Sequence, residues 1–111
     1  MAVESSPTEG LSQAASVHFR LLQRRFVAGL AVRWTDIRDA PDPRSVCAAL
    51  HRLRGGAGSY GFAQLGQCAG ELELLAAQGS GADLAPKLAQ LAAEIHRLEA
   101  HWANPTDTGP A

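Results

Sequence analysis

The sequence predicts an all-α fold, an up-down four-helix bundle. Apolar residues recur at intervals of three and four along four segments of the chain, which is the spacing of one face of an α-helix. Hydrophobic residues make up 46% of the 111 residues, enough for one domain with a core, whereas aromatic residues make up only 5%. Alanine and leucine favour helices, and no segment has the pattern of a β-strand. Four amphipathic helices joined by short loops should pack antiparallel to one another.

The two ends of the chain differ in composition from the middle. Residues 1–10 are polar, with serine, proline, threonine, glutamate and glycine, and predict a disordered leader. The helical bundle should span residues 11–103, and residues 104–111, rich in proline, threonine and glycine, predict a flexible tail. The initial methionine and the two short tails favour a stand-alone protein over a domain excised from a larger sensor.

The first predicted helix is unusually long, running from Leu11 to about Ala40, where Pro41 and Pro43 prevent its continuation. Gly29 lies inside it. The helix either kinks at this glycine or is two helices, and the sequence leaves both alternatives open. Its apolar face comprises Phe19, Leu22, Phe26, Leu30, Trp34 and Ile37.

The second predicted helix runs from Pro43 to Ser59, with Asp42 as N-cap and Gly61 as the stop signal. At about 100° per residue, one side of this helix is apolar and His51 falls on the opposite side. The apolar side comprises Val46, Ala49, Leu53, Ala57 and Tyr60.

Two further helices follow. The third spans residues 62–77, with Phe62, Leu65, Cys68 or Ala69, Leu72 and Leu75 on one face, and residues 78–81 form a loop. Ser80 or Asp83 should cap the last helix, and Pro86 should be tolerated in its first turn. The apolar repeat of this last helix comprises Leu84, Leu88, Leu91, Ile95, Leu98 and Trp102.

Charge and composition exclude several classes of function. The formal net charge of −1 provides no general basic surface for nucleic acid. No stretch approaches the ~20 apolar residues of a membrane span, and the first ten residues lack a signal-peptide pattern. We therefore expect a cytoplasmic protein that binds neither nucleic acid nor membrane, with Cys47 and Cys68 as free thiols.

His51 has an unusual neighbourhood for a surface histidine. Its side of the helix carries Arg44, Cys47, Arg54, Gly55 and Gly58. Together with Gly56, the two glycines cost the helix roughly 3 kcal/mol relative to alanine, a substantial part of a typical total stability of about 5–15 kcal/mol. Close approach of a partner to the imidazole would offset the cost of Gly55 and Gly58. Gly56 is nearer the core side, where close helix packing is the simpler explanation.

A longer motif surrounds this histidine. The sequence resembles the histidine-containing phosphotransfer (HPt) domain family, whose members typically have His-x-x-Lys-Gly, a later glycine and an apolar helix closing on Leu-Glu. Two features depart from the family pattern: Arg54 stands where lysine is usual, and Gly56-Ala57-Gly58 replaces a run richer in serine and alanine. The matching residues are His51, Leu53, Arg54, Gly55, Gly61, Leu65, Cys68, Leu72 and Glu73.

The resemblance implies a phosphorelay intermediate. His51 would accept a phosphoryl group from the aspartyl phosphate of a receiver domain and pass it to another receiver, while Arg54 stabilises the phosphoryl charge. Arg44 and Arg52 would add positive potential, and Cys47, Gly55 and Gly58 would border the docked partner. The partners would be receiver domains of response regulators or hybrid histidine kinases, each supplying its own Mg²⁺. With no cofactor, no metal and no nucleotide-binding motif of its own, the chain would be a monomeric phosphohistidine carrier and not a kinase.

Three other hypotheses account for parts of the sequence. Residues 56–61 match G-x-G-x-x-G, but a dinucleotide site requires a preceding strand, and here a helix precedes the motif. Cys47 and His51 have a spacing that suits two metal ligands, but no second pair is evident on another helix. The remaining alternative is a docking or regulatory module that binds a receiver or kinase and is never phosphorylated. The sequence does not identify the partner kinase and receivers, the direction of phosphoryl flow or the pathway output.

Overall fold

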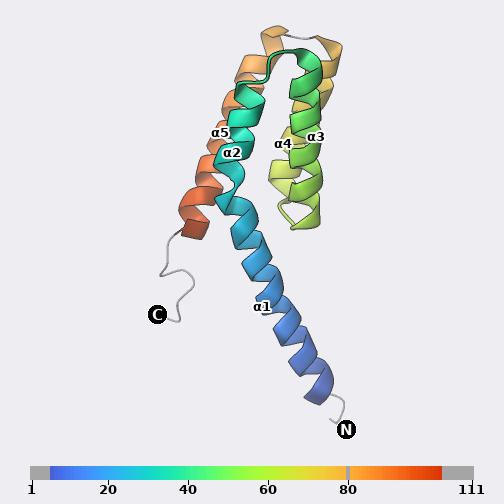
Figure 1. The fold of residues 1–111 in the computed structure, drawn as a ribbon, viewed down its shortest axis with the longest axis vertical. Helices are drawn as coiled ribbons and strands as arrows, with labels where there is room; N and C mark the ends of the chain where they lie inside the picture. The colour runs from blue at the N-terminus through green and yellow to red at the C-terminus, as the bar shows by residue number, and fades with distance from the viewer. Residues whose placement is uncertain (1–5, 80, 104–111) are drawn as a thin grey trace.

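The computed structural model describes residues 6–79 and 81–103, and all of their regular structure is helical. Helices α2 to α5 run alternately up and down and enclose one core, so the predicted all-α, up-down four-helix bundle is confirmed (Figure 1). Helix α1 leads into α2 and adds a further segment to the bundle. The five helices are α1 (Ser6–Ala28), α2 (Leu30–Arg38), α3 (Pro43–Ser59), α4 (Ala63–Gln78) and α5 (Gly81–Ala103).

The first predicted helix is interrupted at Gly29, one of the two outcomes that the sequence left open. The Gly29 amide donates to the carbonyls of both Arg25 and Phe26, each at 3.1 Å, and the Gly29 carbonyl accepts from the Arg33 amide at 3.2 Å. Hydrogen bonding therefore continues across the break. Consequently α1 and α2 follow each other as a bent rod rather than separating into two layers (Figure 1).

Helix α1 begins earlier than predicted. It starts at Ser6, so residues 6–10, which the sequence placed in a disordered leader, are helical. Pro7 falls in the first turn, where the missing amide hydrogen is tolerated because the first four amides of a helix have no intrahelical partner. Residues 1–5 and the predicted tail, 104–111, lie outside the described residues. The N-terminal half of α1 extends past the end of the bundle (Figure 1).

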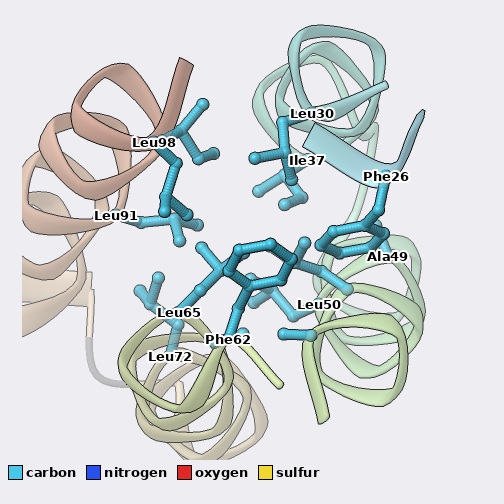
Figure 2. Packing of buried hydrophobic residues seen from close by; sticks show 14 of the residues in the cluster. Phe26, Leu30, Ile37, Ala49, Leu50, Phe62, Leu65, Leu72, Leu91 and Leu98 are labelled. Atoms are coloured by element: carbon cyan, nitrogen blue, oxygen red, sulfur yellow. The ribbon is translucent and has the colours of Figure 1, made fainter. Parts of the chain in front are cut away.

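The core fills the space between the four bundle helices (Figure 2). It confirms most of the predicted apolar faces, since Phe26, Leu30 and Ile37 are buried on the first rod and Leu91, Ile95 and Leu98 on α5. Phe19 is exposed, because it lies on the part of α1 near the end of the bundle. The remaining buried residues are Val27, Ala49, Leu50, Leu53, Ala57, Phe62, Leu65, Ala69, Leu72 and Ala76.

Both ends of α3 are set by specific backbone signals. A carboxylate oxygen of Asp42 accepts a hydrogen bond from the Ser45 amide at 2.8 Å, which confirms Asp42 as N-cap, and this hydrogen bond lowers the pKa of Asp42. At the other end, Gly61 has a φ of 80°, as the sequence predicted for the stop. The Phe62 amide donates to the Ala57 carbonyl and the Gly61 amide to the Gly58 carbonyl, the two bonds of a Schellman motif.

The start of α5 differs from the prediction. The helix begins at Gly81, so Asp83 lies in its first turn instead of capping it, and Ser80 is outside the described residues. Pro86 is then the sixth residue of α5, inside the helix and past its first turn. Helix α4 ends at Gln78, and Gly79, with a φ of 73°, makes the turn that follows. None of the helices in the described ranges contains an apolar stretch of the length that a membrane span requires.

Candidate functional site

His51 lies near the middle of α3, between two leucines that anchor the helix in the core. Leu50 and Leu53 are completely buried, whereas the His51 side chain is 72% exposed. The imidazole therefore projects into solvent from a helix that is packed against the core, and its exposure is as the sequence predicted. A histidine held in this way offers a ring nitrogen to another molecule without any movement of the backbone.

Glu73 of α4 fixes the orientation of this imidazole. Its Oε2 lies 3.1 Å from His51 Nδ1, and its side chain is only 25% exposed because the neighbouring Leu72 is buried in the core. An ionised carboxylate can only accept a hydrogen bond, so Nδ1 carries the hydrogen. The lone pair is therefore on Nε2, the ring nitrogen away from Glu73.

Arg54 completes a group of three charged or ionisable side chains. Its Nη1 lies 3.5 Å from Glu73 Oε1, so the two carboxylate oxygens of Glu73 face His51 and Arg54 separately. Arg54 is 58% exposed, and a pair this open contributes little to stability. What the pair provides is position: a cation lies on the same surface as the imidazole and within reach of a group attached to it.

An open groove of about 520 Å³ runs along α4 beside this group. Its walls include Arg54 and Glu73, the exposed Leu74, and the two glycines Gly66 and Gly70. Glu71, on the same groove, pairs with Lys87 of α5 at 2.6 Å, which lowers the pKa of Glu71 and raises that of Lys87. The groove thus combines small residues with fixed charges next to the histidine.

The three glycines after His51 have different surroundings. A Cβ built on Gly55 or Gly58 would meet no atom within 4 Å, so the surface beside His51 is open. A Cβ on Gly56 would lie only 2.6 Å from Phe26 Cε1. The prediction that Gly56 serves helix packing is therefore confirmed: its missing side chain lets the Phe26 ring of α1 lie against α3.

The structure places the other predicted site residues at different points around α3. Cys47 is half-buried, and its thiol points toward α4, donating to the Glu73 carbonyl at 3.8 Å. Arg52 is exposed but lies beside Thr35 and Asp36 of α2, across the helix from Arg54. Arg44 is exposed one turn before the thiol.

Glu73 has a role in the site that was not predicted from the sequence. The sequence feature that could have indicated this role is the Leu72-Glu73 pair, which was matched only as part of the family motif. A buried leucine on α4 followed by a carboxylate places that carboxylate at the edge of the core, where α4 contacts α3. Which residue of α3 it meets depends on how the two helices pack, so the contact with His51 follows only from the structure.

The other cysteines and histidines form no second centre in the described part of the chain. Both cysteines are free, as predicted, and burial raises the pKa of the Cys68 thiol, which suits a small residue packed against the core. His18, His96 and His101 are exposed. No group of three or more metal-ligating side chains is present among residues 6–79 and 81–103.

The described residues thus form a helical bundle that presents one exposed histidine, oriented by a carboxylate, on α3. The Hpt domain family matches residues 11–101, and the chain belongs to this family. Membership places it in two-component phosphorelay signalling, where Hpt domains act as phosphocarriers rather than kinases and generally interact with receiver domains of response regulators. No curated protein and no solved structure gives a match to the chain.

Proposed function

We propose that this protein is a phosphorelay intermediate that accepts a phosphoryl group on His51 from one receiver domain and donates it to another. The observation that carries the proposal is the contact of His51 Nδ1 with Glu73 at 3.1 Å on an exposed face of the bundle. This contact orients the ring and leaves the lone pair of Nε2 free to act as the nucleophile.

The transfer is a displacement at phosphorus. The lone pair of Nε2 forms the P–N bond, the bond between phosphorus and the aspartyl oxygen of the receiver breaks, and its electron pair leaves with the carboxylate. The imidazole becomes a cation when Nε2 is bonded to phosphorus, because Nδ1 keeps its hydrogen. Glu73, which accepts that hydrogen, stabilises the positive ring. The reverse displacement by a second aspartate discharges the histidine.

Arg54 supplies part of the charge stabilisation. Its guanidinium is one turn from His51 and close to the shared carboxylate, so it can reach equatorial phosphoryl oxygens with paired N–H donors. We propose that the receiver supplies the rest through its bound Mg²⁺ and acidic pocket. We likewise propose that this chain binds no cofactor, acts as a monomer and is a carrier, not an enzyme.

The approach of a receiver is supported by the open surface around His51. Gly55 and Gly58 add no side chain to the surface next to His51, and Arg44 adds a cation on the exposed side of α3. The alternative, a docking module that binds a receiver without being phosphorylated, would use the same surface. The nucleophile and the carboxylate that orients it favour the phosphorylated function.

Phosphotransfer to His51 is the direct test. We expect the purified protein to take up label from a phosphorylated receiver, and the label to be labile in acid and stable in base, as phosphohistidine is. His51→Gln should take up none while keeping its circular dichroism spectrum and thermal midpoint, since the side chain is exposed.

Two results would contradict the proposal. Label on the His51→Gln variant would move the acceptor elsewhere, with His18, His96 and His101 as candidates. A wild-type protein that binds a receiver in a titration but takes up no label from a panel of phosphorylated receivers would support the docking module.

A further inference from the structure

The side chain of Arg54 crosses from its own helix to α4 and lies over Gly70. A Cβ built on Gly70 would be 3.4 Å from Arg54 Cδ, 3.5 Å from Nε and 4.0 Å from Cζ. The stem and the first atoms of the guanidinium therefore pass directly above a residue with no side chain. Glu73 lies three residues further along α4, where it meets Nη1 of the same guanidinium.

Gly66, the glycine one turn earlier on α4, contacts a different part of α3. A Cβ on Gly66 would meet Ala57 Cβ at 3.5 Å and the Arg54 carbonyl at 3.8 Å, so Gly66 faces the body of α3. Successive turns of α4 thus contact the helix, the arginine stem and the arginine head. The absence of a side chain at Gly70 is what leaves the middle of this path open.

We propose that Gly70 is a positioning residue for Arg54: it keeps open the track along α4 that holds the guanidinium beside Glu73 and His51. This inference rests on the proposed function for its consequence in phosphotransfer, but the track itself is a feature of the fold. Without this track, the Arg54 side chain would extend into solvent. There it would sample many rotamers, and its guanidinium would no longer be held next to the histidine.

The distances also predict how much side chain position 70 tolerates. A separation of 3.4 Å between carbon atoms is close to ordinary van der Waals contact. A methyl group therefore fits under the arginine stem, whereas any side chain that continues beyond Cβ has to share the track with Arg54. Gly70→Ala should leave Arg54 in place, and Gly70→Leu should displace it.

The experiment is a double-mutant cycle with phosphoramidate as the donor. A small donor removes any effect of the added bulk on receiver docking. Arg54→Ala should slow labelling of His51 by about ten- to a hundred-fold, the value of one charge-assisted hydrogen bond in the transition state. Gly70→Leu should slow it by a similar factor, and Gly70→Ala by less than about twofold.

The cycle is closed by the double variant. If Gly70 acts through Arg54, Gly70→Leu should have no further effect in the Arg54→Ala background. Ala77→Leu is the matched control, because Ala77 is exposed, lines the same groove and lies two turns beyond Gly70. It should label at the wild-type rate. Should Gly70→Leu lower the thermal midpoint, Gly70→Gln, which also extends beyond Cβ, makes the same comparison.

Two outcomes would overturn the inference. Gly70→Leu labelling at the wild-type rate while Arg54→Ala is slow would show that Arg54 does not need the track. An equal loss in both Arg54 backgrounds would show that position 70 acts by another route.

A spectroscopic readout separates this inference from the proposed function. Nuclear Overhauser contacts between the Arg54 side chain and the Gly70 Hα protons should be present in the wild type, and Gly70→Leu should lose the contacts of Arg54 with α4. If no donor labels His51, the proposed function fails, and these contacts still decide whether Gly70 holds Arg54. Their absence in the wild type would overturn the inference.

Discussion

At the scale of single residues, the glycines of α3 show that one residue type can have opposite roles within three positions. Gly56 makes room for the Phe26 ring inside the bundle, whereas Gly55 and Gly58 leave room outside it, beside His51. Sequence composition shows only that the helix tolerates several poor helix formers. The separation into inner and outer glycines follows from their positions around the helix axis, which the 100° spacing already indicates.

Exchange of these glycines should separate docking from folding. Gly58→Leu should hold or raise the thermal midpoint, because the site is open and glycine is the poorer helix former. It should also sharply reduce transfer from a receiver, since about 1 Å of misplacement can cost a hundred-fold in rate, while labelling by phosphoramidate stays near the wild-type rate. Gly56→Ala should lower the thermal midpoint, because its methyl group would overlap Phe26. Wild-type transfer from the receiver to Gly58→Leu would show that the partner docks elsewhere.

At the scale of the element, the two ends of α3 and its buried leucines together determine where His51 lies and which way it faces. The Asp42 cap and the Schellman motif at Gly61 define where the helix starts and stops. Between them, burial of Leu50 and Leu53 sets the rotation of the helix about its axis. The site therefore depends on local signals that can be predicted from the sequence and on helix packing that cannot.

The cap should give α3 a characteristic dependence on acid. The hydrogen bond from the Ser45 amide lowers the pKa of Asp42 in the folded state. The stabilisation is therefore present above the unfolded-state pKa and lost as the pH falls through the folded-state pKa, that is, below about pH 4. Asp42→Asn keeps a good N-cap but does not titrate. Below pH 4, urea unfolding should show the wild type losing more stability than this variant.

Other carboxylates titrate in the same range, and the comparison removes their contribution. Glu71, whose pKa is lowered by Lys87, is present in both proteins and affects both curves equally. Parallel stability curves for the wild type and Asp42→Asn between pH 2 and pH 6 would mean that the cap does not contribute to acid unfolding.

At the scale of the whole molecule, the bent rod formed by α1 and α2 gives the protein its length. The radius of gyration is 17.5 Å, against about 13 Å for a compact domain of 100 residues. The excess comes from α1, which extends past the bundle while its last turns supply Phe26 and Val27 to the core (Figure 1). The bundle core is thus assembled from all five helices.

The face of α5 that packs against the core should contribute strongly to the free energy of unfolding. Leu91 is completely buried and meets the other helices at the centre of the bundle (Figure 2). Leu91→Ala should lower the free energy of unfolding by about 2–5 kcal/mol in urea. Leu74→Ala is the matched control, because Leu74 is 62% exposed, and it should change the value by less than about half a kcal/mol. A change of less than about half a kcal/mol for Leu91→Ala would mean that this face of α5 does not pack against the core.

The sequence alone was sufficient for the fold class, the bundle helices, most of the apolar faces, both ends of α3 and the exposed His51. These follow from local propensity and from the repeat of apolar residues, which act over a few turns of chain. It was insufficient for the start of α1 and for the break at Gly29, because weak helix formers and a single interior glycine leave the balance between helix and coil close to even.

The contacts between helices were decided only by the tertiary structure. The burial of Leu50, the meeting of Glu73 with His51 and Arg54, and the path of Arg54 over Gly70 all depend on how α3 and α4 rotate and slide against each other. A helical repeat determines which side of each helix is apolar, but two apolar sides can pack in several registers. Side-chain packing over the whole core selects one register, and that register places the carboxylate beside the imidazole.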